Sequence, residues 1–234
     1  MPSLPRALSR LLLPLAVVAA PLAVTAPASA DVTGSTSTDD VVLFSRCQTH
    51  QIAYDVLVDP GTLLWRLEVQ VVSPRGQLSE GTVINSATNP ATSGTVPYTF
   101  CGSEEQGTYT VKATGFYQLL PAVQIPFALP MTTFQAKPAA TRTSLHEKPL
   151  GHGRYRLDSL VKEQDVQGFR NGKGITVRLE RLVHGDWKTV RGTALTTVRG
   201  RATTTLGGRP GDKVRAVVPA RNNLAGSVSR PVTL

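Results

Sequence analysis

Residues on which catalytic and metal chemistry depends are scarce in this chain. Its 234 residues include two cysteines, two tryptophans and four histidines, and aromatic residues make up 6% of the total. Neither a C-x-x-C nor an H-x-x-x-H spacing occurs, so the ligand pairs of a typical zinc site are missing. The few aromatic side chains also provide no interleaved platform for stacking bases, which argues against specific nucleic-acid recognition.

Hydrolase and nucleotide-binding motifs are missing as well. No G-x-S-x-G elbow occurs, and His146, His152 and His184 adjoin Gly or charged residues in segments that we expect to be loops. The segment NGKG, residues 171–174, lacks the Lys-Ser/Thr pair of a phosphate-binding loop. We therefore expect no enzyme activity, no catalytic residue, no metal and no cofactor. We expect the acidic side chains to form a solvated edge. The alternative is that carboxylates of inter-strand loops bind calcium.

A long apolar run occurs only at the start of the sequence. Residues 1–30 place Arg6 and Arg10 before an apolar stretch that ends in the small residues 28–30. This order predicts a secretory signal peptide cleaved after Ala30, with a retained N-terminal anchor as the alternative. No later run is long enough to cross a membrane, and no cysteine follows the cleavage site closely enough to accept lipid. We expect the mature chain to be secreted, and to be extracellular or associated with the cell wall.

Export has a consequence for the two cysteines. Outside the cytoplasm a pair of free thiols meets oxidants, so Cys47 and Cys101 are predicted to form one disulfide. Two buried free thiols are the alternative. Closing a loop of about 55 residues restricts the unfolded chain and stabilises the fold by about 4 kcal/mol in the chain-entropy model.

Charge is divided unevenly between the two halves of the chain. Residues 31–136 carry four basic and nine acidic side chains, whereas residues 137–234 carry nineteen basic and seven acidic ones. A strongly basic region accumulates polyanions around it, while a mildly acidic one does not. The second half is therefore the part of the chain whose charge bears on partners.

Short apolar segments separated by turn residues predict the fold class. Segments such as QIAYDVLV (51–58) and LLWRLEVQVV (63–72) are rich in β-branched residues, and no stretch shows a sustained helical period. In ITVRLE, Ile175, Val177 and Leu179 are expected to face inward and the residues between them outward. The pattern predicts an all-β chain of antiparallel sandwiches.

The composition shift predicts the domain boundaries. It falls in the proline-containing segment QAKPAATRT, residues 135–143, which we predict to link two β domains. We predict a disordered leader at 31–40, a first β-sandwich with the disulfide at 41–136, and a basic β-sandwich at 137–234.

The segment GTYTVKATG, residues 107–115, resembles the penultimate strand of bacterial immunoglobulin-like domains, with Tyr109 at the corner and Val111 facing inward. The second half, with its "VRLERL", "WKTV" and "SVSRPVTL" segments, is similar to a repeat of exported actinomycete-type proteins. The resemblance implies two tandem immunoglobulin-like antiparallel β-sandwiches that act as structural or binding modules. Cys101 precedes the Tyr109 strand, so the bridge is expected to tie an edge strand to a neighbouring strand or loop.

Two further predictions concern the basic half. The triplet HGD, residues 184–186, is predicted to be a hairpin turn in which Gly185 takes a positive φ and Asp186 hydrogen-bonds to nearby backbone. Basic residues on neighbouring predicted strands could form one cationic face; the predicted polyanion-binding residues are Arg178, Arg181, Lys188, Arg191, Arg199, Arg201 and Arg215. A scattered basic surface, or one that docks onto the acidic first half, is the alternative.

Taken together, these features predict a secreted, non-enzymatic binding or scaffolding protein of the cell envelope or the extracellular space. Its expected partners are cell-wall polyanions or another extracellular protein. The alternative is a secreted effector or inhibitor that presents loops of the first domain, such as SATNPATSG (86–94), to a protein partner.

Overall fold

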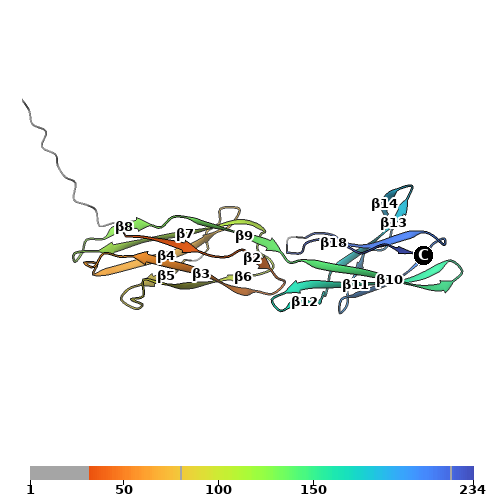
Figure 1. The fold of residues 1–234 in the computed structure, drawn as a ribbon, viewed down its shortest axis with the longest axis horizontal. Coiled ribbons are helices and arrows are strands. Elements are labelled where there is room, and N and C mark those ends of the chain that lie inside the picture. The colour runs from red at the N-terminus through yellow and green to blue at the C-terminus, as the bar shows by residue number, and fades with distance from the viewer. Residues whose placement is uncertain (1–31, 80, 222) are drawn as a thin grey trace, which may run out of the picture. The chain divides into compact units, whose positions relative to one another are not determined.

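The computed structural model describes residues 32–79, 81–221 and 223–234 (Figure 1). These residues form strands and turns and no helix, so the predicted all-β fold class is confirmed. Within them there is accordingly no helix of the length and apolarity that crossing a membrane requires. The predicted signal peptide, residues 1–30, lies outside the described residues.

The first half of the described chain forms two sheets. One has the strand order β1-β3-β6, and the other has the order β2-β9-β7-β4-β5 with β8 paired to β7. The pairing is antiparallel except for β2 with β9. The strands are β1 (Thr33–Ser37), β2 (Val41–Leu43), β3 (Gln48–Leu57), β4 (Leu64–Val72), β5 (Thr82–Asn85), β6 (Ser93–Phe100), β7 (Gly107–Gln118), β8 (Ile125–Ala128) and β9 (Thr132–Pro138).

Alternation along these strands builds the first hydrophobic cluster. In β4, Trp65, Leu67 and Val69 are buried, while Arg66 between them is exposed. Trp65 is therefore a core residue, as its apolar surroundings in the sequence predict. The cluster draws its members from both sheets of this half, which is how a sandwich closes its core.

The predicted disordered leader is wrong for residues 33–37, which form strand β1. This strand pairs along its whole length with β3, and Thr36 is buried. Gly34 allows the close approach, because a Cβ atom there would collide with the backbone oxygen of Asp55. Ser and Thr residues are compatible with an edge strand, so a polar composition alone does not exclude pairing.

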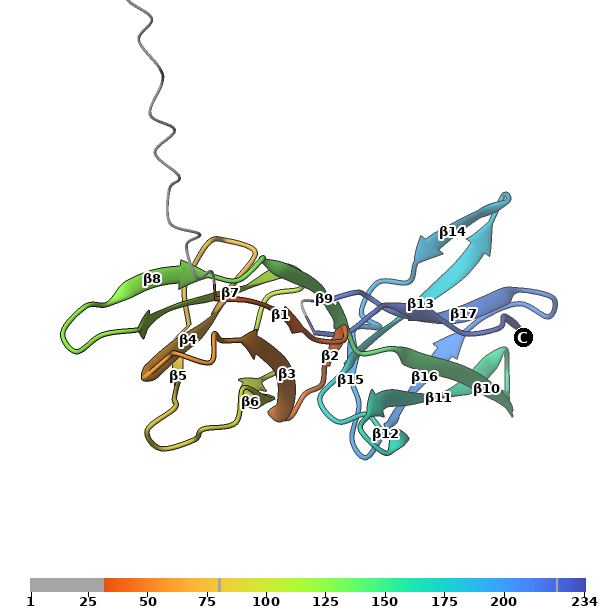
Figure 2. The same cartoon turned by 60° about the vertical axis from the view of Figure 1, so that its left-hand side comes forward.

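The second half of the described chain also forms two sheets (Figure 2). One has the order β10-β11-β12 with β16 paired to β11, and the other has the order β14-β13-β17-β18 with β15 on β13 and β19 on β17. The strands are β10 (Thr141–Gly151), β11 (Arg154–Asp165), β12 (Gly168–Asn171), β13 (Thr176–Val183), β14 (Asp186–Thr189), β15 (Leu195–Thr196), β16 (Arg201–Gly207), β17 (Lys213–Val218), β18 (Ser227–Val228) and β19 (Val232–Thr233).

The inward sides of these sheets form the second hydrophobic cluster. Ile175, Val177 and Leu179 are buried and Arg178 is exposed, so the predicted alternation of this strand is confirmed. Leu157 and Val161 of β11 face the same cluster from the other sheet. Each sheet of this half therefore has one side buried in the core and one side exposed to solvent.

The predicted link at residues 135–143 is almost entirely strand. Strand β9 ends at Pro138 and β10 begins at Thr141, which leaves Ala139 and Ala140 between them. Ala139 is fully buried; its amide donates to the carbonyl of Asn223 and its carbonyl accepts from the amide of Ala225. A segment whose backbone groups are buried and hydrogen-bonded is held in place by the fold.

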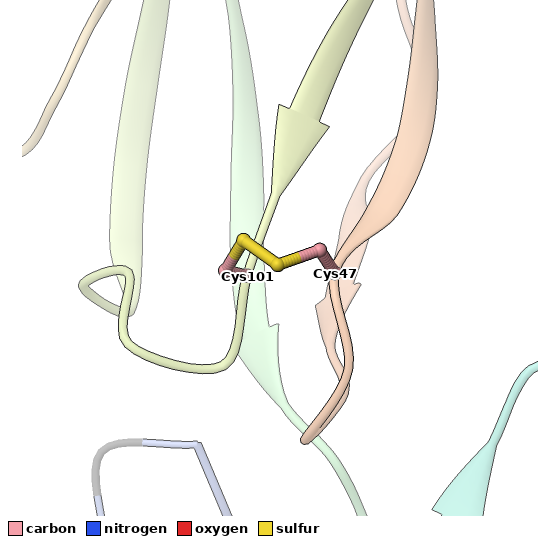
Figure 3. The surroundings of a disulfide bond; sticks show 2 residues. All are labelled: Cys47 and Cys101. Atoms are coloured by element: carbon pink, nitrogen blue, oxygen red, sulfur yellow. A yellow bond between two sulfur atoms is a disulfide. The ribbon is translucent and has the colours of Figure 1, made fainter.

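The predicted disulfide between Cys47 and Cys101 is present (Figure 3). Cys47 directly precedes β3 and Cys101 directly follows β6, and the neighbouring residues Gln48 and Phe100 face each other across the two strands. Strand β6 is at the edge of its sheet. The bridge therefore ties an edge strand to its neighbour, as the position of Cys101 predicted.

Tyr109 is buried as the resemblance implies. Its side chain is 1% exposed, Val111 is fully buried, and the Tyr109 hydroxyl donates a hydrogen bond of 2.9 Å to the carbonyl of Glu105. This bond fixes the loop that leads from Cys101 into β7. Burial, with a smaller contribution from the Glu104 carboxylate, raises the pKa of Tyr109 to about 12.

Removing the disulfide by the double substitution Cys47→Ser and Cys101→Ser should lower the free energy of unfolding by up to about 4 kcal/mol. The bridge spans 54 residues of sequence, and losing it enlarges the unfolded ensemble. Denaturant unfolding followed by circular dichroism measures the effect. A double variant with wild-type stability would contradict the stabilising role of the bridge.

Replacing Tyr109 by Phe should destabilise the fold by about 1–2 kcal/mol at neutral pH, because the Glu105 carbonyl loses its donor. In the unfolded chain a tyrosine ionises near pH 10, whereas the folded chain resists ionising Tyr109 until about pH 12. Wild-type stability should therefore fall between pH 10 and 12, and the variant should lose part of that fall. Tyr155→Phe is the matched control, since the described residues offer its hydroxyl no hydrogen-bond partner, and unfolding at several pH values separates the two.

Candidate functional site

The triplet HGD is a hairpin turn between β13 and β14. Val183 and Asp186 face each other, so the turn itself consists of His184 and Gly185, with φ angles of 51° and 92°. Positive φ at both positions is typical of the type I′ turn that matches the twist of paired strands. The predicted turn is confirmed, but Asp186 begins β14 instead of closing the turn.

The predicted polyanion-binding residues lie on different sides of the second half. Arg178 and Arg215 are on the outward side of β13 and β17. Arg215 is engaged there: it pairs with Glu180 at 2.7 Å, and its guanidinium carbon lies 4.2 Å from the centre of the Trp187 ring. Its charge is therefore partly neutralised within the chain.

Arg181 and Lys188 face each other on the opposite side of β13 and β14, because strand alternation reverses the side at every residue. Arg181 is held inside the fold by Asp212, at 3.5 Å, and by the carbonyl of Gly207. Arg181 is half-buried, and its ion pair with Asp212 is part of the fold.

The remaining three predicted residues, Arg191, Arg199 and Arg201, are exposed. Arg191 follows β14, and Arg199 has a positive φ of 52° in the turn between β15 and β16. Arg201 lies on β16, which belongs to the other sheet of this half. The structure thus does not bring the seven predicted residues onto one face.

A denser group of cations lies on the outward side of the sheet that contains β10, β11 and β16. In β11, Leu157 and Val161 point into the core, so Arg156, Asp158 and Lys162 point outward. The register of β10 and β16 against β11 then fixes which side chains share this outward side. We call the part of this side from Arg142 to Lys148 of β10, with the residues of β11 and β16 beside it, the β11 face; it consists of Arg142, Ser144, His146, Lys148, Arg156, Asp158, Leu160, Lys162, Arg201, Thr203 and Thr205. Arg154, also exposed, lies on the same side just beyond it, opposite Gly207.

These residues stand in rows across the strands. Facing residues of β10, β11 and β16 form the rows Lys148, Arg156 and Thr205, then His146, Asp158 and Thr203, then Ser144, Leu160 and Arg201, and at the far end Arg142 and Lys162. The five cations of the face are all exposed to solvent. Asp158 is its one acidic residue among the described residues.

Two of the rows place like charges directly opposite each other. Lys148 faces Arg156 at one end, and Arg142 faces Lys162 at the other. Cβ atoms of facing residues are about 4.5–5.5 Å apart, and like charges at that position destabilise a sheet. As like-charge pairs they do not stabilise the sheet.

Asp158 is already engaged by its neighbours. The Thr203 hydroxyl donates to it at 2.6 Å, and Arg156 approaches it at 3.2 Å. The Thr203 hydrogen bond, and to a smaller degree the charge of Arg156, lower the pKa of Asp158 below its usual value. The carboxylate therefore remains ionised at neutral pH. Among the described residues Arg142, Lys148 and Lys162 form no ion pair, and Arg201 interacts with Asp158 through its charge alone.

Apart from its cations, the face carries mainly polar side chains. Thr203 and Thr205 expose hydroxyl groups, and the nearest aromatic ring, Phe169 of β12, is covered by the guanidinium of Arg142 at 3.9 Å. Such a surface offers charge and hydrogen-bond donors, and its own residues include no Phe, Tyr or Trp ring on which a sugar could stack. No three His, Cys, Asp or Glu side chains in the described ranges gather closely enough to hold a metal ion.

Four of the five cations on this face are not among the residues predicted from the sequence to bind polyanions. That prediction followed the density of arginine between residues 178 and 215, whereas Arg142, Lys148, Arg156 and Lys162 lie earlier in the chain. A signal was present: basic side chains recur at even spacings within each of two consecutive predicted strands. What was missing was the register that places one strand beside the other.

The comparisons with known proteins do not assign a family. No protein-family model matches this chain, and no curated protein matches it. Among solved structures it is similar to E. coli alpha-2-macroglobulin in the native conformation, with 13% sequence identity over 88% of this chain and a TM-score of 0.32. The chain spans 14% of the length of that protein's chain. A similarity of this size does not bear on function.

The like-charge rows lead to a test of stability. Lys162→Thr should leave the fold as stable or more stable by about 0.2–1 kcal/mol at low salt, because it removes the charge opposite Arg142. The gain should shrink as salt screens the charges. Arg215→Thr is the matched control: it removes the partner of Glu180 and the cation above Trp187, and should destabilise the fold. A loss of stability in the Lys162 variant equal to that of the control would show that Lys162 is a structural residue.

Proposed function

We propose that this chain is a secreted, non-enzymatic protein of two immunoglobulin-like β-sandwiches, and that its β11 face binds anionic polymers of the cell envelope or the extracellular space. The observation that carries the proposal is the composition of that face: five exposed cations and one engaged carboxylate on one side of one sheet. Secretion is supported by the disulfide, since such bonds persist in oxidising compartments.

The shape of the face favours a polymer over a small anion. Its cations stand on three strands of a sheet whose side chains point into solvent, so no enclosed site surrounds a single charge. An extended polyanion gains from many such contacts at once, because each phosphate or carboxylate that is neutralised releases counterions. The surrounding half of the chain, with nineteen basic and seven acidic side chains, adds long-range attraction.

The face is also unsuited to reading a nucleic-acid sequence. Recognition of single strands relies on aromatic platforms, and the Phe169 ring beside the face is covered by Arg142. We therefore propose affinity for polymer charge and spacing.

The test replaces four cations of the face and compares the result with four cations elsewhere. The face variant carries Arg142→Ser, Lys148→Ser, Lys162→Ser and Arg201→Ser; the control carries Arg178→Ser, Lys188→Ser, Arg191→Ser and Lys213→Ser. Both lose the same net charge, and all eight residues are exposed. Binding of poly(glycerol phosphate) by the mature protein, measured by titration calorimetry, should fall at least tenfold more in the face variant.

The salt dependence of the affinity is the second measurement of the same experiment. The slope of log affinity against log salt should decrease by roughly one for each phosphate contact that the face variant loses, and should change less in the control. Equal losses in both variants would show that only total charge matters. Binding that persists above about 0.5 M salt would contradict the electrostatic proposal. Absence of polymer binding, together with tight capture of one extracellular protein, would favour the effector or inhibitor alternative.

A further inference from the structure

The two like-charge rows stand at opposite ends of the β11 face. From Arg142 to Lys148 along β10, and from Lys162 to Arg156 along β11, the separation is six residues. An antiparallel strand rises about 3.4 Å per residue, so the two cation pairs are about 20 Å apart. We call them the Arg142–Lys162 pair and the Lys148–Arg156 pair.

The surface between the two pairs carries little net charge. Asp158 lies in it, already bonded to Thr203 and Arg156, and Leu160 occupies the next row. Arg201 flanks this middle section from β16. An anion therefore gains most at the two ends of the face.

Each pair is suited to a tetrahedral oxyanion. Two cationic side chains that rise side by side from neighbouring strands can each donate to a different oxygen of one phosphate group, and the bound charge relieves their repulsion. A planar carboxylate carries a single charge and matches the fork of one guanidinium. Arg142 is steadied over Phe169, which limits the freedom that it loses on binding.

We propose that the β11 face holds one linear phosphate-bearing polymer that runs along the strands and occupies both cation pairs at once. This inference rests on the proposed function and names its ligand class and its mode of binding. Occupying one pair makes the second encounter intramolecular, so the polymer binds far more tightly once it reaches both. The face then selects for chain length as well as charge.

The test uses linear inorganic polyphosphates of defined length, with spans below and above about 20 Å. Their affinity for the mature protein is measured by titration calorimetry at fixed salt, normalised to the number of phosphate groups. We expect the association constant to rise abruptly, by about 10²- to 10⁴-fold, as the span passes that length. A smooth rise of the association constant with chain length would overturn the inference that one polymer occupies both pairs.

Two pair variants sharpen the test: Arg142→Ser with Lys162→Ser, and Lys148→Ser with Arg156→Ser. Either variant should abolish the abrupt rise. Combining the two variants should lower the affinity for long chains by little more than the sum of the losses expected for contacts that do not bridge the pairs. The control Arg178→Ser with Lys188→Ser removes two exposed charges elsewhere and should keep the rise. Persistence of the rise in both pair variants would overturn the inference. Equal unfolding midpoints show that the variants are folded.

A chain of uronic acids with the same span distinguishes phosphate from carboxylate. We expect it to bind more weakly than polyphosphate, and equal affinity would overturn the phosphate assignment. Absence of binding at every length would overturn the proposed function itself, whereas binding without a length threshold would overturn only the present inference.

Discussion

The burial of alternate side chains between two sheets is the constraint on which the second half of this protein depends. Leu157 and Val161 of β11 and Val177 and Leu179 of β13 are fully buried in one cluster. Because successive side chains of a strand point to opposite sides, burying these residues forces their neighbours into solvent. The cations of β11 are therefore displayed as a consequence of the core, on a backbone that the core holds rigid.

Covalent and polar links play the corresponding role at one end of the first half. The disulfide joins the end of β6 to the start of β3, and a few residues later Tyr109 is bonded to the Glu105 carbonyl. Phe100 and Phe134 pack against the Tyr109 ring, with ring centres 5.2 and 5.5 Å away. The loop between β6 and β7 is thus fixed at both of its ends.

Not all arginines of the basic half serve the same purpose. Arg181 and Arg215 are paired with Asp212 and Glu180 and contribute to the fold. Arg142 and Lys148 instead face Lys162 and Arg156, an arrangement that costs stability. This contrast separates the arginines that form ion pairs within the fold from the cations that face a like charge, which a count of basic residues cannot do.

The sequence by itself determined the features that depend on local pattern or on composition. The all-β class follows from short alternating segments, the disulfide from two cysteines, the buried position of Trp65 from its apolar strand, and the basic second half from its charge. Polar composition misled at one place, because residues 33–37 pair as strand β1. Only the tertiary structure decided which cations share a face. Arg142 meets Lys162, and Arg201 meets Leu160, through strand registers that join residues about 20 and about 40 positions apart, and a shift of one residue would turn every side chain to the other side.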